Sequence, residues 1–556
     1  MLRHFRNFSV FTDESRIEIF VNNYRWFSLP FGSSINQPKK KDVDGEIIQY
    51  TEQESEDVFH AEWAVHSSCW EKKIYLLDAK ENGIYYRTRV VGGGRVQNIE
   101  FFNSGERSYE VGGYLLPIVG HADYSTSLRT MVQEESIGLC YQAPPMYCFP
   151  FFTDQDDLWF GIGIVAKPGE YNFDRFIHHG LLQLELPLYG QTTVDGEWES
   201  QGIWIAPAQG GIDVLRKYSA WHYDEGLCKR ARAASEAPRW WKGPIFCGWG
   251  SQLALVDQLK SSQWAKQKYL NFTTIGASER KEYATQEVYQ YFSDILDRED
   301  LHPAYIIIDS RWQKSCGAAM PDPKKWPDLR AYTDAEHKKG RKVVLWFKAW
   351  NNEGLDEDEC IMDLCRPVAA DPFSPKYQNR VKNMMYKLLS EDDGCYNCDG
   401  FKIDFANCMP LGTDVVSAGN KYGVELLKAL MILLHDSAKA VKSDALISCC
   451  ACHPYFAEIC DQARLHDYND QTRLLCSTMR FREKLFHAAL PDVLIDTDEG
   501  GIESHREFVS YMKLQPNLGI PDLFNLLPRG QTPMDADDFN TVRQAWSIYI
   551  ARIENS

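Results

Sequence analysis

The feature that most constrains the fold is an alternation of short apolar runs and helical patterns that begins near residue 236. The runs are apolar through their middles, as expected of parallel strands that are covered on both faces. Alternation of this kind, repeated eight times, predicts a (β/α)8 barrel, also called a TIM barrel. The predicted strands are 245–249, 305–309, 343–347, 401–405, 446–450, 463–466, 493–495 and 519–523. The predicted helices are 285–296, 331–339, 375–389, 422–441, 472–485, 504–514 and the closing helix 535–554.

A long stretch, 251–281, separates the first predicted strand of the barrel from the first predicted helix. Connections inside compact domains are usually much shorter, and the long ones are often functional. We therefore expect a loop on the active-site face of the barrel.

The N-terminal part of the chain has a different hydrophobic pattern. Short β-branched or aromatic runs at 17–21, 73–77, 84–91 and 158–165 are bounded by turn residues, and the first long helical pattern is 212–233. Asn82-Gly83 is a typical two-residue hairpin turn. Many strands with few helices predict a large antiparallel β-sandwich. A chain of 556 residues has room for two large domains, which we expect at 1–235 and 236–556.

Net charge and composition exclude several classes of partner. The formal net charge of −18 disfavours nucleic acid and anionic membranes, and it favours a neutral small substrate over a phosphorylated one. No run is long enough to span a membrane. Residues 1–8 contain no apolar signal segment, so the 16 cysteines favour reduced thiols in a cytoplasmic protein. Association into a homo-oligomer is left open.

The fourth predicted strand of the barrel ends in a carboxylate. Alternation along the strand places Lys402 and Asp404 on one face, near the C-terminal end, where barrel enzymes carry their chemistry. A lysine beside an aspartate favours the ionised carboxylate that a nucleophile requires. The alternative is a structural ion pair, because Lys-x-Asp is common.

A second carboxylate, Asp467, follows the sixth predicted strand, with Arg464 three residues before it. Arg464 could bind a substrate hydroxyl or tune a carboxyl group, although a surface ion pair would give the same pattern. Asp404 ends the fourth strand and Asp467 follows the sixth, two strands apart around the barrel, so both can face one sugar across its mouth. Glycosidases use such a carboxyl pair, one member as nucleophile and the other as acid/base.

Other strand ends carry groups suited to sugars. Carboxylates bind pairs of hydroxyl groups, and indole rings stack on the apolar faces of pyranoses. Each residue alone is more readily interpreted as structural, but five strand ends of this type together favour a carbohydrate site. The candidate binding residues are Asp309, Trp312, Trp346, Lys402, Arg464, Trp249, Asp496, Asp498 and His466.

These motifs resemble the clan of retaining α-glycosidases that contains glycoside hydrolase families 27, 31 and 36 (clan D). The similarity is greatest to family 36, the α-galactosidases, with raffinose and stachyose synthases as relatives. In that family a strand-four Lys-x-Asp carries the nucleophile, which matches Lys402 and Asp404. Its arginine motif after strand six carries the acid/base, which matches Arg464 and Asp467. The Arg-x-x-Asp spacing and the Asp-x-Asp of 496–498 are similar to the raffinose synthase branch.

One motif departs from the family pattern. The family's strand-two sequence Asp-Asp-Gly-Trp is Asp309-Ser310-Arg311-Trp312 here. In α-galactosidases the two aspartates bind the 4- and 6-hydroxyl groups, so Ser310 leaves the identity of the sugar open.

The resemblance implies a retaining α-glycoside hydrolase that acts on an oligosaccharide or another glycoside through Asp404 and Asp467 and needs no metal or organic cofactor. A raffinose-synthase-like transglycosylase and an α-glucosidase-type hydrolase are the alternatives, and a non-catalytic carbohydrate-binding protein is disfavoured by the carboxyl pair. Cys395-x-x-Cys398 could belong to a zinc site, but buried or loop thiols are the favoured interpretation.

Overall fold

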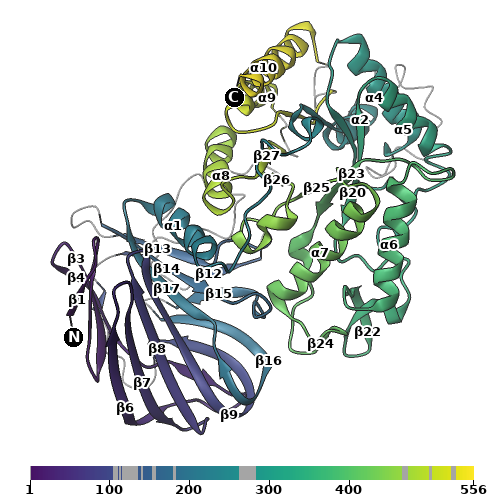
Figure 1. Cartoon of the computed structure of the whole chain (residues 1–556). Helices are drawn as coiled ribbons and strands as arrows, with labels where there is room; N and C mark the ends of the chain where they lie inside the picture. Colours follow the sequence, from purple (N-terminus) through teal and green to yellow (C-terminus); the bar gives the residue numbers. More distant parts are fainter. Residues whose placement is uncertain are drawn as a thin grey trace.

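The computed structural model describes most of the chain, in an N-terminal β-sheet part followed by a barrel part (Figure 1). The described residues are 2–103, 110–111, 114–115, 135–139, 142–152, 158–179, 183–261, 283–465, 474–499, 502, 504–526 and 534–555. Within these ranges no helix is long and apolar enough to cross a membrane.

Two antiparallel sheets make up the N-terminal part, as predicted. Aromatic side chains join them: Trp26 of the smaller sheet lies 5.4 Å from Phe160 of the larger, between ring centroids. The smaller sheet has the order β1 (Leu2–His4), β2 (Ser9–Thr12), β3 (Arg16–Val21), β4 (Tyr24–Pro30) and β10 (Glu110–Val111). The larger sheet contains β5 (Ser34–Asn36), β6 (Asp44–Glu54), β7 (Phe59–Ser67), β8 (Lys72–Lys80), β9 (Gly83–Phe101), β11 (Tyr114–Leu115), β12 (Glu135–Gly138), β13 (Cys148–Phe152), β14 (Trp159–Val165), β15 (Arg175–His178), β16 (Leu184–Glu199) and β17 (Gly202–Ala208).

The predicted hairpin between β8 and β9 forms, but its turn is one residue earlier than expected. Lys80 pairs with Gly83, so the two loop residues are 81 and 82. Gly83 has φ +139°, and a Cβ there would lie 2.7 Å from Trp204 Nε1. Glycine is therefore needed at the first position of β9 and not in the turn itself.

Eight parallel strands form the predicted barrel. A parallel bridge between Asp496 and Ile520 completes the ring, which is nearly closed. In the register of the two central strands, Lys348 lies beside Asp404 and Trp346 beside Lys402. Around the barrel the order is β27 (Leu494–Asp496), β26 (Gln462–Arg464), β25 (Leu446–Cys449), β23 (Gly400–Asp404), β20 (Lys342–Lys348), β19 (Tyr305–Ile308), β18 (Ile245–Cys247) and β28 (Asp522–Leu523).

Most predicted helices of the barrel form close to their expected bounds and cover its outside (Figure 1). Their starts follow from capping: Ser374 caps the helix that begins at Pro375, and Asp535 caps the last helix. The helices are α4 (Gln286–Arg298), α5 (Leu329–Lys338), α6 (Pro375–Leu389), α7 (Gly423–Val441), α8 (Leu475–Ala489), α9 (His505–Leu514) and α10 (Ala536–Glu554).

The prediction for the start of the barrel was wrong in one respect. The first strand ends at Cys247, and α2 (Gly248–Ser261) begins at once, where we expected the strand to continue to 249 and a loop to begin at 251. A Cβ on Gly248 would lie 2.0 Å from the Tyr289 hydroxyl, so glycine allows the close turn. Residues 262–282 of the expected loop lie outside the described residues.

A small antiparallel sheet after β20 was not predicted. It consists of β22 (Arg366–Ala370), β21 (Cys360–Asp363) and β24 (Val415–Val416), and the short 3-10 helix Glu357–Glu359 precedes it. Its strands have two to five residues, which is too short for a period-two pattern to be visible.

Helix α1 (Gly211–Asp224) joins the two parts. It ends near a glycine with positive φ, Gly226, and so is shorter than the predicted 212–233. Its buried Tyr218 donates a hydrogen bond to Ile164 O of the sheet part and lies 3.2 Å from His453 Nε2 of the barrel part. Backbone hydrogen bonds also cross the junction, such as Ala143 N to Cys450 O at 3.2 Å. The two parts are therefore packed together.

Candidate active site

Asp404 is the last residue of β23, and its carboxylate reaches the mouth of the barrel with 21% of the side chain exposed. Three donors bind it: Trp346 Nε1 at 3.0 Å, Arg464 Nη2 at 3.1 Å and the backbone N–H of Phe405 at 2.9 Å. Such donors, one of them charged, stabilise negative charge on both carboxylate oxygens. The strand therefore presents an ionised, partly accessible carboxylate in a fixed orientation.

The backbone turns sharply directly after the strands that surround Asp404. Phe405 adopts a left-handed conformation with φ 58°, and the same region of conformational space is taken by Trp350 after β20 and Arg311 after β19. This conformation is uncommon outside glycine, and such strain is concentrated at functional sites. Arg311 stands where the resembling family has glycine, so the left-handed turn persists without the residue that adopts it most easily.

Arg464 connects the candidate nucleophile to the interior. Its guanidinium is fully buried, with Nη1 2.5 Å from Asp498 Oδ2 and Nη2 3.1 Å from Asp404 Oδ1. Arg464 therefore bridges two carboxylates, one at the mouth of the barrel and one in its interior.

The sequence placed Lys402 beside Asp404, but the Lys402 ammonium is paired with other carboxylates. Its ammonium contacts Asp309 Oδ2 at 3.1 Å and Asp498 Oδ2 at 3.3 Å. Burial alone would lower the pKa of Lys402, but Asp309 and Asp498 raise it well above its ordinary value. The lysine is therefore a permanent cation beneath the site, while Arg464 supplies the cation that contacts Asp404.

The tryptophans of the strand ends differ in their surroundings. Trp312 is fully buried and donates from Nε1 to Trp346 O at 2.8 Å, so it supports the residue that binds Asp404. Trp346 itself is 3% exposed. Trp249 lies half-buried in the first turn of α2 and packs against the interior of the barrel.

Below Arg464 lie carboxyl groups that no solvent reaches. Asp496 and Asp498 are fully buried, and Asp498 N donates to Asp496 Oδ1 at 2.9 Å. Burial, and then the charge of Asp498, raise the pKa of Asp496 to about 7. Burial and the neighbouring Asp496 also raise the pKa of Asp522 well above its ordinary value. The interior therefore holds carboxyl groups that are partly protonated near neutral pH.

The raised pKa of Asp496 has a consequence for stability. Between the ordinary value of 3.8 and about 7, the folded protein binds more protons than the unfolded chain, so the free energy of unfolding falls as the pH rises through this window. Asparagine stays neutral throughout. We expect Asp496→Asn to become more stable relative to the unaltered protein between pH 5 and pH 8, measured by urea unfolding at both values. Parallel pH profiles for the two proteins would contradict the assignment.

Two residues of this polar interior were missed by the sequence analysis. Asp522 begins β28, where it pairs with Ile245, and the Cys247 thiol donates to Asp309 Oδ2 at 3.3 Å. Cys247 ends its strand but is not a residue type that favours sugar binding, and Asp522 lies inside the predicted strand 519–523, so neither was selected as a site residue.

The predicted acid/base Asp467 and its neighbour His466 lie outside the described residues, and both stay predictions from the sequence. Among the described residues no cluster of three or more histidine, cysteine or acidic side chains could hold a metal ion. Cys395 and Cys398 are both buried.

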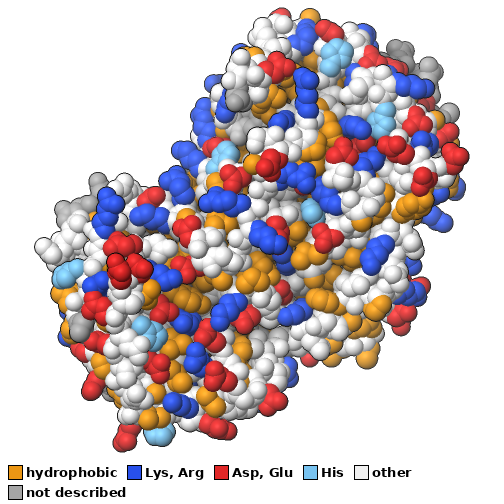
Figure 2. All heavy atoms as spheres, in the orientation of Figure 1, with side chains coloured by type: hydrophobic (Ala, Val, Ile, Leu, Met, Phe, Trp, Pro, Cys, Tyr) orange, Lys and Arg blue, Asp and Glu red, His pale blue; other side chains and the backbone are white. Residues whose placement is uncertain are grey.

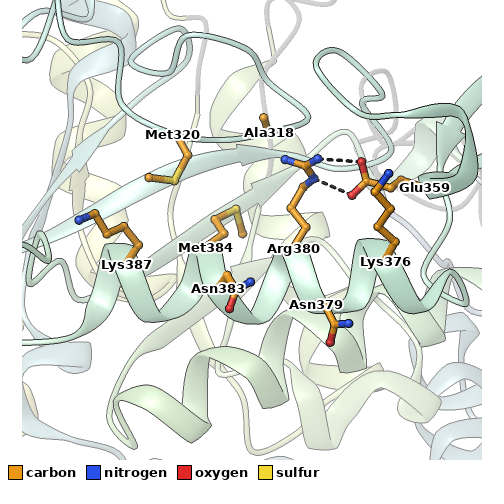
Figure 3. A pocket seen from close by; sticks show the side chains of 9 residues that line it. All are labelled: Ala318, Met320, Glu359, Lys376, Asn379, Arg380, Asn383, Met384 and Lys387. Atoms are coloured by element: carbon orange, nitrogen blue, oxygen red, sulfur yellow. Dashed lines mark hydrogen bonds and ion pairs between the residues drawn. The ribbon is translucent and has the colours of Figure 1, made fainter.

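A cavity of about 500 Å³ lies beside α6, away from these residues (Figure 3). Arg380 closes one side of it through a two-point ion pair with the buried Glu359, at 2.6 and 2.8 Å. None of the residues predicted to form the active site lines this cavity. The lining residues are Ala318, Met320, Glu359, Lys376, Asn379, Arg380, Asn383, Met384 and Lys387.

Comparison with known proteins supports the fold. No family model and no curated protein sequence matches the chain. Solved structures do: a quadruple mutant of the α-N-acetylgalactosaminidase NagBb from Bifidobacterium bifidum has a TM-score of 0.61 at 10% identity, over 99% of this chain and 92% of that one. A GH31 family sulfoquinovosidase from E. rectale has a TM-score of 0.52 at 11% identity, over 97% and 82%. The chain thus shares its architecture with distant glycoside hydrolases.

Proposed function

We propose that the protein is a retaining α-glycoside hydrolase of the α-galactosidase type, with Asp404 as its nucleophile and Asp467 as its acid/base. The observation that supports this most is the environment of Asp404. Its carboxylate is oriented by Trp346, Arg464 and the Phe405 N–H at the mouth of a barrel, where enzymes of this fold carry their chemistry.

The reaction takes two displacements. Asp404 attacks the anomeric carbon and forms a C–O bond, while the glycosidic C–O bond breaks and Asp467 gives its proton to the leaving oxygen. Asp467, now ionised, takes a proton from water, and the water oxygen displaces Asp404 from the anomeric carbon. The free sugar leaves with its original configuration, and both carboxyl groups return to their starting states.

The buried residues hold the nucleophile in place during both steps. Arg464 and Trp346 fix both oxygens of Asp404, and Asp498 in turn fixes Arg464. Positioning of this kind lowers the barrier because the reacting atoms need no further ordering. The ion pair of Lys402 with Asp309 forms the floor, where a carboxylate can accept hydrogen bonds from sugar hydroxyls.

The names of the structural neighbours are consistent with an α-glycoside substrate. NagBb is an α-N-acetylgalactosaminidase with a GalNAc complex, and the E. rectale enzyme is a sulfoquinovosidase with an aza-sugar inhibitor. They act on different sugars, so they support the reaction class more than a particular substrate.

An α-glucosidase-type hydrolase is the second candidate. Ser310 replaces the second aspartate that binds the 4- and 6-hydroxyls in α-galactosidases, and the half-buried Ser310 carries no charge that could take over this role. A raffinose-synthase-like transglycosylase would use the same carboxyl groups, with a sugar acceptor in place of water.

A panel of p-nitrophenyl α- and β-glycosides, with product anomers followed by NMR, tests the reaction class. We expect turnover of α-glycosides alone, with the α-anomer released first. Addition of sugar acceptors separates hydrolysis from transglycosylation. Release of the β-anomer from an α-glycoside, or turnover of β-glycosides only, would contradict the proposal.

A further inference from the structure

Among the residues that the structure describes, one cation at the mouth of the barrel has no acidic partner. Lys348 ends β20 and lies in register with Asp404 on the neighbouring strand. No described carboxylate lies within ion-pair distance of its ammonium, which instead sits 4.9 Å from the centre of the Phe405 ring. A cation left without a counter-charge beside a nucleophile needs an explanation, because aspartate and glutamate are abundant in this chain.

The two cations deeper in the barrel, by contrast, have acidic partners. Lys402 contacts Asp309 and Asp498, and Arg464 contacts Asp404 and Asp498. Among the described residues, Asp309, Asp404 and Asp498 are thus paired with Lys402 and Arg464, and none of them pairs with the Lys348 ammonium.

The surroundings of Lys348 include a second cation. Burial raises the pKa of the Cys316 thiol, Arg311 and Lys348 oppose the rise, and Glu353 adds to it, so both cations and this carboxylate lie near the same thiol. Arg311 is only loosely paired, with Nη1 3.8 Å from Glu353 Oε2. The oxygen of Glu353 is shared, since it also accepts the Cys316 N–H at 3.0 Å. Around Cys316, two described cations therefore share one described carboxylate, Glu353.

Lys348 is also close enough to touch a bound sugar. Neighbouring strands lie about 4.8 Å apart, so the base of Lys348 is that far from the residue that would bond to the anomeric carbon. The Phe405 ring beneath the ammonium is 41% exposed and offers an apolar face next to the charge. A ring-shaped ligand with an acidic substituent would match both features.

We infer that Lys348, together with Arg311, recognises an acidic group on the sugar, so that the substrate is an anionic α-glycoside bearing a carboxylate, sulfonate or phosphate. This inference rests on the proposed glycosidase function. The overall charge of −18 favoured a neutral substrate, but screening by salt limits charges to a range of about 10 Å, so the local cations dominate at the site. Figure 2 shows that acidic and basic side chains are interspersed over the face in view.

The test compares matched pairs of aryl α-glycosides that differ in one charged group. The galactoside is compared with the galacturonide. The glucoside is compared with the glucuronide, with the 6-sulfo analogue of the glucoside and with the glucoside 6-phosphate, so that carboxylate, sulfonate and phosphate are tested separately. We expect kcat/KM to be at least about tenfold higher for one acidic member than for its neutral partner, as a charge-assisted hydrogen bond would give. Lys348→Gln should lower this acidic-to-neutral ratio by roughly tenfold or more, and Lys348→Glu should lower it further.

Lys382→Gln is the control, because Lys382 is exposed on α6. The acidic-to-neutral ratio of kcat/KM of this variant should equal that of the unaltered protein. A preference for the neutral member of every pair, or a ratio that Lys348→Gln leaves unchanged, would overturn the inference while the glycosidase function stands. Failure to turn over any glycoside, neutral or acidic, would overturn both.

Discussion

Replacing Asp404 with alanine should lower kcat/KM for aryl α-glycosides by roughly 10⁴-fold or more, because no other group can form the covalent intermediate. Arg464 and Trp346 would lose a partner but keep their backbone positions. Asp414→Ala is a suitable control, since Asp414 is an exposed acidic residue that follows the same strand. Thermal unfolding of both variants shows whether the loss is one of chemistry or of folding.

Rescue of the Asp404→Ala variant by azide provides a second test of the nucleophile. The small anion can enter the space left by the carboxylate and attack the anomeric carbon from the same side, which yields a β-glycosyl azide from an α-glycoside. We expect azide to restore part of the activity of Asp404→Ala and none of that of a misfolded protein. An α-glycosyl azide, or near-normal turnover without azide, would show that Asp404 is not the nucleophile.

Replacing Asp467 with alanine should have an effect that depends on the leaving group. General acid catalysis contributes roughly 10²- to 10⁴-fold when the leaving oxygen needs a proton and much less when it does not. We expect kcat/KM of Asp467→Ala to fall by that range for alkyl glycosides and to fall least for 2,4-dinitrophenyl glycosides. The measurement is a series of substrates with leaving groups of decreasing acidity.

A uniform loss across the Asp467→Ala series would mean that Asp467 does not donate the proton. The conservative variant Asp467→Asn serves as a second test, because it keeps the size of the side chain and removes only the acid. Asp461, a carboxylate six residues earlier that is fixed by Lys439, contacts none of the residues around Asp404 and offers a contrasting position.

The barrel could be predicted because each strand and helix leaves a periodic trace in the sequence. The pattern over 375–389 gave α6 to the residue, since Ser374 and Pro375 mark its start. The small sheet formed by β21, β22 and β24 could not be predicted, because strands this short show no period. The early start of α2 depends on the contact of Gly248 with Tyr289, two residues that are far apart in sequence.

The candidate site, like the fold, could be predicted only in part. Position at the ends of strands β23 and β26 was enough to bring Asp404 and Arg464 together. The partner of each charge was not predictable: only one residue separates Lys402 from Asp404 in the sequence, yet the Lys402 ammonium contacts Asp309 and Asp498. Pairing in a barrel interior depends on which side chains meet across strands, and this appears only when the register is known.

The central claim is that Asp404 forms a covalent bond to the sugar, and trapping of that intermediate tests it most directly. A fluorinated α-glycosyl substrate with a good leaving group slows the second displacement, so the glycosyl-enzyme accumulates and peptide mass spectrometry locates the label. We expect one sugar per chain, attached to Asp404 in the peptide that contains 400–408. A label on another carboxylate, or unlabelled protein that turns the same substrate over with inversion, would contradict the assignment.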